Sequence, residues 1–224
     1  MGKGSCRRPV FSLFLVAAVI LAFSPVSLAA TFTVNPGDDA SAINAVIAGA
    51  VKGDTIVFND GTYNLASKIV VEVDGLTLQS QTTGGAKIIA SSYPVISPGD
   101  TIGMTIDGLH FEAFDDSIDA CVYFGGGSPT SPVTITNCTF IGFSEYTIEA
   151  TSWESMTYDF TVTNNTFRDC AWGVYAEDFE DCTVDVSDNT FENCADYAME
   201  IGDFGKNGST MTITISGNTI TADE

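Results

Sequence analysis

The sequence predicts an all-β fold: a single-stranded right-handed parallel β-helix (a solenoid) with one short capping helix near the N-terminus. Two observations lead to this prediction. A six-residue motif recurs six times, with successive starts 24 to 33 residues apart. Alternating apolar and polar residues precede several copies, as in Thr212-Ile213-Thr214-Ile215. A regular period of this length is typical of solenoids, in which each coil packs on the next.

Residues 1–29 have the features of a secretory signal peptide. Three basic residues precede an apolar run of about 14 residues, and Ser27-Leu28-Ala29 resembles a cleavage site. A membrane span needs roughly 20 apolar residues, so the run is too short to anchor the chain. We therefore expect a secreted or cell-surface protein without membrane insertion after cleavage, in which the β-helix domain spans residues 31–224.

The charge of the chain limits its partners. Removal of residues 1–29 takes away three of the eight basic residues and none of the 29 acidic ones, which leaves a formal charge of −24. This charge argues against nucleic acid as a partner, because nucleic acids bind clustered Lys and Arg. Hydrophobic residues make up 45% of the chain and include 15 Phe, so an apolar core inside a solvated acidic shell is expected.

Each copy of the motif predicts a strand, a tight turn and a second strand. Its first residue is β-branched, its third is Gly, Asn or Asp, and its sixth is large and apolar. Gly, Asn and Asp tolerate a left-handed backbone, so the third position is where the chain bends. Stacked Asn side chains, such as Asn165 and Asn189, are expected to bond from coil to coil. The copies are residues 73–78, 106–111, 135–140, 162–167, 186–191 and 215–220.

A second ladder of buried residues is expected three positions after the motif, formed by Phe114, Phe143, Cys170 and Cys194. The two cysteines are interpreted as stacked buried thiols. A disulfide between adjacent coils is the alternative, because the expected Cα separation allows one.

The two ends of the stack differ. Asp38 or Asp39 is expected to cap a short helix that covers the N-terminal coil, followed by a first strand and turn within residues 53–63. No cap is visible after residue 220. Truncation of the chain, cover by another subunit, or protection by the acidic tail would each account for this, and self-association through the uncapped C-terminal coil is predicted.

These features together resemble the pectin-lyase-like superfamily of right-handed parallel β-helix proteins, in particular repeat-containing surface proteins. The opening segment is similar to that of alginate and chondroitin lyases, a resemblance that implies a Lys and an Arg in proton transfer and charge neutralisation, often with calcium. No Lys lies at a matching position in a coil adjacent to Arg168, and the Gly-His-Gly element of polygalacturonase-like hydrolases is absent.

Acidic side chains are the candidate metal ligands. Glu177, Asp178, Glu180 and Asp181 form the densest acidic run, in a turn between two strands. Carboxylate oxygens suit calcium, so this turn is the candidate calcium site, with a solvated acidic turn as the alternative. A second cluster with the same alternatives comprises Asp115, Asp116 and Asp119.

The remaining candidates are interpreted structurally. Arg168 is expected to point outward and pair with Glu192 of the next coil, and His110 to lie in an outward ladder otherwise formed by Thr. Trp153 and Tyr158 are candidates for a sugar-binding platform beside a long loop.

The sequence therefore predicts a non-catalytic extracellular or surface module with a structural, adhesive or carbohydrate-contacting role. A polysaccharide or cell-surface glycan is the expected partner. The alternative is a small polysaccharide lyase or glycoside hydrolase of the same fold. No catalytic or cofactor-binding residue is assigned.

Overall fold

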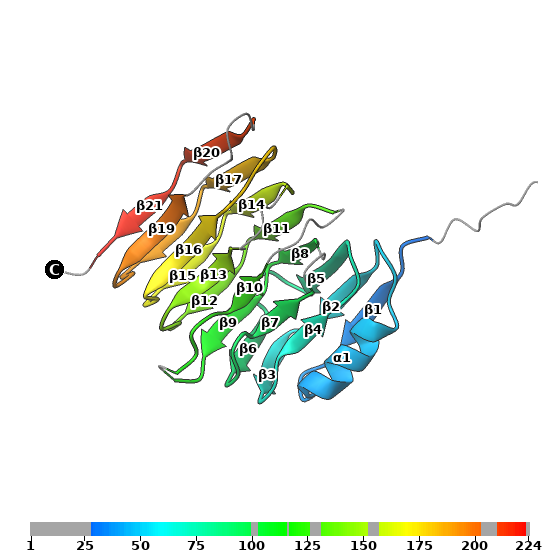
Figure 1. Cartoon of the computed structure of the whole chain (residues 1–224). Helices are drawn as coiled ribbons and strands as arrows, with labels where there is room; N and C mark the ends of the chain where they lie inside the picture. The colour runs from blue at the N-terminus through cyan, green and yellow to red at the C-terminus, as the bar shows by residue number, and fades with distance from the viewer. Residues whose placement is uncertain are drawn as a thin grey trace, which may run out of the picture.

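The computed structural model describes residues 28–99, 103–115, 117–125, 131–151, 157–202 and 210–222. The predicted signal peptide lies outside these residues, apart from its last two positions. The described chain forms a right-handed parallel solenoid of three sheets, here called sheets 1, 2 and 3, with eight, seven and six strands respectively. Figure 1 shows the coils stacked from the blue N-terminal helix to the red C-terminal strands. The predicted fold class is confirmed.

Each complete coil contributes one strand to each sheet in turn, and every strand pair is parallel. Sheet 1 consists of β1 (Thr31–Val34), β2 (Thr55–Phe58), β5 (Leu76–Ser80), β8 (Met104–Asp107), β11 (Val133–Thr136), β14 (Phe160–Thr163), β17 (Thr183–Ser187) and β20 (Thr212–Ser216). Sheet 2 consists of β3 (Gly61–Leu65), β6 (Ala86–Ala90), β9 (His110–Ala113), β12 (Thr139–Ile141), β15 (Thr166–Arg168), β18 (Thr190–Glu192) and β21 (Thr219–Thr221). Sheet 3 consists of β4 (Ile69–Val71), β7 (Ile96–Pro98), β10 (Val122–Phe124), β13 (Tyr146–Ala150), β16 (Trp172–Glu177) and β19 (Tyr197–Gly202).

The repeated motif forms the corner between sheets 1 and 2 in five of its six copies. The third position has φ between 56° and 67° in all five, as the choice of Gly, Asn or Asp predicted. These positions are Gly108, Asn137, Asn164, Asp188 and Gly217.

The first copy, residues 73–78, was assigned to the wrong corner. Leu78 pairs in sheet 1 with Ile106, the first residue of the next copy, instead of with Phe111. Ile88 of β6 takes the place opposite Phe111. The error arises because Gly75 also adopts a left-handed backbone, with φ 72°, at the corner that leads into sheet 1. Two corners of similar residue type cannot be distinguished by pattern alone.

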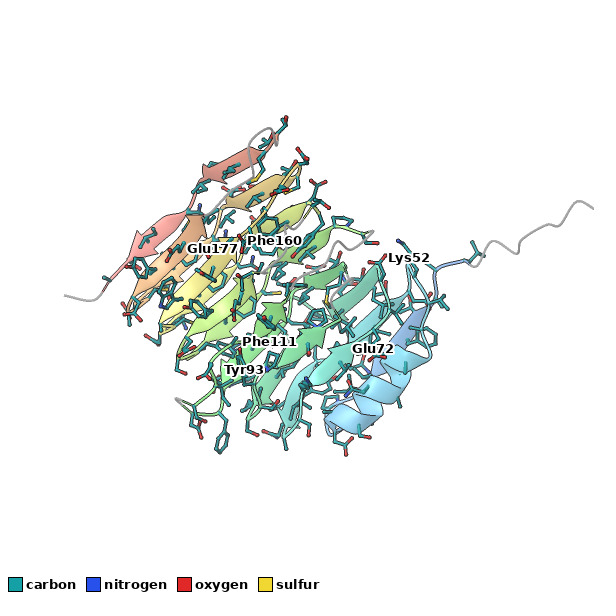
Figure 2. All side chains as sticks on the ribbon, in the orientation of Figure 1. Lys52, Glu72, Tyr93, Phe111, Phe160 and Glu177 are labelled. Atoms are coloured by element: carbon teal, nitrogen blue, oxygen red, sulfur yellow. The ribbon has the colours of Figure 1, made fainter. Side chains whose placement is uncertain are left out.

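Two predicted ladders run through the interior. Phe111, Phe140, Phe167 and Phe191 are buried and stack with ring centroids 4.8 to 5.4 Å apart, and Figure 2 shows Phe111 and Phe160 among the side chains of the stack. At the corner, the Asn165 amide donates to the carbonyl of Ile135 at 2.9 Å and to Asn189 Oδ1 at 3.1 Å. Asn189 makes the equivalent bonds to Val162 and Asn218, so the coil-to-coil amide ladder is confirmed.

The ladder predicted three positions after the motif is confirmed in part. Phe143 and Cys170 are buried and Cys194 is half-buried, and backbone hydrogen bonds align the three in successive coils. Phe114 was placed wrongly in this ladder, because its side chain is 67% exposed after the chain turns outward at the end of β9. All five described cysteines are free thiols.

The predicted N-terminal capping helix is confirmed, and it begins where the sequence indicated. Helix α1 (Ala40–Ala48) is capped by Asp39, whose carboxylate accepts a hydrogen bond from the Ala42 amide at 2.9 Å. Ile43 and Ile47 of this helix are fully buried against the first coil. Sequence reasoning missed β1, the first strand, which precedes α1 and pairs with β2. Within the described residues, no helix is both long and apolar enough to cross a membrane.

The opposite end of the described stack lies open. All residues of β20 and β21 are exposed, and Ile213, Ile215 and Ile220 are 42%, 53% and 63% exposed. These side chains continue the interior ladders, but no further coil packs on them within the described residues.

Candidate functional site

The outward face of sheet 3 carries a row of aromatic side chains. Tyr146, Trp172 and Tyr197 lie opposite one another at the first position of β13, β16 and β19. The Trp172 ring lies with its centroid 4.9 Å from that of Tyr146 and 4.4 Å from that of Tyr197. Tyr175 joins the same cluster, 4.6 Å from Tyr146 and 5.7 Å from Trp172. We call these four residues the aromatic platform.

The local backbone turns these rings outward. Along β16, Gly173 and Val174 are both buried, which places Trp172 and Tyr175 on the solvent side. Thr147 is buried at the corresponding place in β13, and its hydroxyl donates to the carbonyl of Trp172 at 2.7 Å. A Cβ atom at position 173 would lie closer than 3.0 Å to the Ala198 carbonyl and to the Phe191 ring. Glycine at this position therefore allows β16 and β19 to approach beneath the platform.

A second outward row runs beside the platform and alternates Tyr with Glu. Tyr123, Glu149, Tyr175 and Glu200 are opposite one another in four successive coils. Neighbouring strands in a sheet are about 4.8 Å apart, so Glu149 lies between two tyrosine side chains. Desolvation by burial, together with the charge of Glu145, raises the pKa of Glu149 to about 7.

A groove of roughly 390 Å³ opens over this second row. The Tyr175 hydroxyl donates a hydrogen bond to the Glu177 carboxylate, and burial together with this bond raises the pKa of Tyr175 far above its ordinary value. The groove thus has aromatic walls and carboxylate edges. Its lining residues are Tyr123, Gly125, Glu149, Thr151, Tyr175, Glu177 and Asp178.

Two of the four predicted calcium ligands line this groove, and Glu180 and Asp181 do not. Glu177 and Asp178 line it, whereas Asp181 accepts a hydrogen bond from the Thr210 amide at 2.7 Å on the other side of the turn. Asp178 and Asp181 both adopt a left-handed backbone. No group of three or more His, Cys, Asp or Glu side chains suited to a metal occurs in the described part of the chain. Calcium at this turn stays a prediction, supported only if added calcium raises the melting temperature.

The described residues of the second acidic cluster also bond to different partners. Asp115 accepts a hydrogen bond from the Ser117 amide at 3.0 Å, and Asp119 accepts one from the Ser144 hydroxyl at 3.3 Å. Asp116 lies outside the described residues.

The basic side chains of sheet 2 lie in ion pairs, as Arg168 was expected to do. Arg168 Nε is 2.7 Å from Glu192 Oε2 in the next coil. Lys87 pairs with Glu112, and His110 lies 3.8 Å from the same carboxylate. His110 is opposite Thr139 in the expected outward ladder, although Lys87 stands in the place assigned to Thr77.

His110 has features of a proton acceptor. Its Nε2 atom is buried and makes no hydrogen bond within the described residues. Burial and the positive charge of Lys87 lower the pKa of the imidazole, so the ring is neutral near pH 7.

The sugar platform expected beside Trp153 and Tyr158 is not formed by Tyr158. The Tyr158 side chain is 5% exposed and packs edge-on against Phe179, so this expectation was wrong. Trp153 lies outside the described residues. The signal that would have found the aromatic platform is the recurrence of Tyr, Trp and Tyr at the start of the third strand in successive coils. Sequence reasoning had interpreted those segments only as buried strands.

Comparison with known proteins identifies the family. The profile described as a right handed beta helix region matches residues 33–220. The chain belongs to the right-handed β-helix family. No curated protein matches this member of the family at a significant level.

Solved structures similar to this β-helix protein include two of the alginate lyase AlyGC, of family PL6. A point variant of AlyGC has 15% sequence identity and a TM-score of 0.56, with 84% of this chain and 29% of that chain covered. The second AlyGC structure has 16% identity and a TM-score of 0.40, with 86% and 40% covered. The chain thus spans well under half the length of AlyGC. At 15% identity the likeness to the first AlyGC structure shows the shared fold alone.

Proposed function

We propose that this protein is a non-catalytic, secreted or cell-surface β-helix module that binds polysaccharide or cell-surface glycan on the outward face of sheet 3. The aromatic platform carries this proposal. The Trp172 ring contacts the other three rings, and the four rings, tilted against one another by 31° to 87°, form an aromatic surface on a solvent face against which sugar rings can pack. Clusters of exposed apolar side chains are typical of interaction sites.

The fold supports the same role. Parallel stacking repeats the aromatic position about every 4.8 Å along the solenoid axis, so an extended chain can contact several coils at once. The alginate lyase AlyGC has a similar solenoid. Its activity is not transferred to this chain.

The test is affinity electrophoresis in gels that contain polysaccharides of different charge and linkage. We expect at least one polysaccharide to retard the secreted chain, and Trp172→Ala to abolish the retardation. Phe114→Ala is the matched control, because Phe114 is an exposed aromatic residue outside the platform. Equal retardation of the wild type and Trp172→Ala would contradict the proposal.

The alternative, a small lyase or hydrolase, is favoured by one observation: the neutral His110, whose buried Nε2 makes no hydrogen bond, lies beside Lys87 and Glu112. A lyase needs a base and a positive group near the reacting carbon. The assay is incubation with alginate, pectate and chondroitin while absorbance of the unsaturated product is read. Product formation that is lost in His110→Ala would favour the enzyme over the binding module.

A further inference from the structure

The groove beside the aromatic platform differs from the platform in its charge. Three of its seven lining residues are Glu149, Glu177 and Asp178, and none is basic. The next residue of the same outward row is Glu200. A ligand that lies across this surface therefore meets several carboxylates.

Basic side chains of the described residues lie elsewhere and are engaged there. Lys52 pairs with Asp74, Lys87 with Glu112 and Arg168 with Glu192, all outside sheet 3. Lys68 lies near the N-terminal end, where its ammonium is 3.4 Å from the Ser97 hydroxyl. Within the described part of the chain, nothing neutralises the groove, so it repels a uronic-acid polymer at short range.

Glu149 is the central group of the groove. It lies between Tyr123 and Tyr175 in the outward row and is half-buried. No hydrogen-bond donor is among the causes of its pKa shift, which are burial and the negative charge of Glu145. Burial and a neighbouring negative charge both disfavour an ionised carboxylate, and a cation that enters beside it offsets this cost.

The flanking tyrosine rings favour the same kind of ligand. Aromatic faces attract ammonium groups through their quadrupole, and cages of aromatic side chains are a known means of binding organic cations. The groove volume of roughly 390 Å³ lies within the range of small-ligand sites. Aromatic walls and a carboxylate floor together fit a protonated amine attached to a sugar ring.

We propose that the groove formed by Tyr123, Glu149, Tyr175, Glu177 and Asp178 binds an amine-bearing, cationic glycan, with the sugar ammonium beside Glu149. This proposal rests on the proposed function and specifies its substrate class. The neighbouring platform stacks the adjoining sugar rings, and the groove selects for the positive charge.

The test uses two ligands with the same backbone and different charge. Oligomers of β-1,4-linked glucosamine carry free amines, whereas oligomers of N-acetylglucosamine are neutral. Isothermal titration calorimetry of the secreted chain is expected to show at least tenfold tighter binding of the glucosamine oligomer, which weakens as salt is added. Glu149→Gln is expected to remove most of this preference without weakening the binding of the N-acetylated oligomer. Folding of this variant is checked by its melting temperature.

Proton exchange supplies an independent readout. A cation beside Glu149 favours the ionised carboxyl, whose pKa is about 7 in the free protein. The same contact favours the protonated form of the ligand amine, so the proton exchange near pH 7 combines uptake by the amine with proton release from Glu149. Titrations in buffers of different ionisation enthalpy measure the net exchange. The release is expected to decrease in Glu149→Gln and to be unchanged in Glu112→Gln, a carboxylate on sheet 2.

The outcomes separate the two proposals. Equal binding of both oligomers, or an unchanged preference in Glu149→Gln, would overturn the amine proposal and leave glycan binding at the platform intact. Retardation by acidic polysaccharides without binding of glucosamine oligomers would also overturn it. If no polysaccharide or oligomer binds, both proposals are wrong.

Discussion

At the residue scale, the corner ladder of asparagines is the most demanding polar feature of the interior. The side chain of Asn189 accepts from the backbone and side-chain amides of Asn165 and donates to the Val162 carbonyl and to Asn218. It is 1% exposed. Water therefore cannot replace these bonds if the side chain is removed.

We predict that Asn189→Ala lowers the free energy of unfolding by about 3 kcal/mol, because it leaves several buried groups without partners. Asn218→Ala, in the exposed last coil, is expected to cost about 1 kcal/mol. Urea denaturation followed by circular dichroism measures both. An equal decrease in the free energy of unfolding in the two variants would show that burial does not increase the contribution of these hydrogen bonds to stability.

Gly173 is a second position at which one side chain decides the local structure. A Cβ there would meet the Ala198 carbonyl and the Phe191 ring closer than 3.0 Å. We predict that Gly173→Ala lowers the free energy of unfolding by about 2 kcal/mol through forced displacement of β19. Thermal melting compares it with Gly202→Ala, where a Cβ meets only the Glu177 side chain, at 3.7 Å. A melting temperature equal to that of Gly202→Ala would contradict the prediction.

At the scale of elements, the pH response of the groove follows from Glu149. Its pKa is raised from 4.5 to about 7 in the folded protein, so the folded state binds this proton more strongly than the unfolded state. The stability that the protonated carboxyl contributes is fully present below pH 4.5 and is lost as the pH rises through about 7.

We predict that Glu149→Gln therefore raises the melting temperature more at pH 8 than at pH 4.5. The difference between variant and wild type is the quantity to measure, since it removes the contributions of the other carboxylates. Glu145→Gln is the control for the cause: loss of its charge is expected to move the transition to lower pH. A difference that does not change with pH would contradict the pKa shift.

The regular corner was predictable from the sequence because one backbone requirement recurs there. Left-handed geometry restricts the third motif position to Gly, Asn or Asp, and such a restriction is visible in a single sequence. The interior Phe and Asn ladders were predictable for the same reason, since identical neighbours stack on each other.

The platform could not be recognised in the same way. Aromatic residues in a strand indicate burial as readily as exposure, and the two consecutive buried residues in β16 break the simple alternation that would have shown which side Trp172 faces. Glu149 gave no signal either, because its properties come from Tyr123, Tyr175 and Glu145 in three different segments.

At the scale of the whole molecule, the open end of the stack bears on association. Unpaired strand edges and exposed apolar side chains are a template for pairing with another chain. In β20 the exposed Ile213 and Ile215 combine both features. Self-association through this coil stays a prediction of the sequence.

The expected outcome is a concentration-dependent rise in mass in sedimentation velocity, which Ile215→Lys reduces. Thr214→Lys is the matched control, since this residue alternates with Ile213 and Ile215 along the strand. A monomer at every concentration, or association that Ile215→Lys leaves unchanged, would show that this coil is not an interface.

The contrast between the two ends of the described stack predicts the order in which its coils unfold locally. Helix α1 shields the first coil, whereas within residues 28–222, as far as the structure describes them, β20 and β21 pair with a strand on one side only. In a linear array each coil is held mainly by the coils next to it, so opening that starts at β20 and β21 exposes the next coil in turn. Amide exchange is therefore expected to slow step by step from Thr221 toward the interior coils. The aromatic platform on β13, β16 and β19 lies within this gradient of exchange rates. A glycan bound across the platform would therefore also slow the local unfolding of these coils.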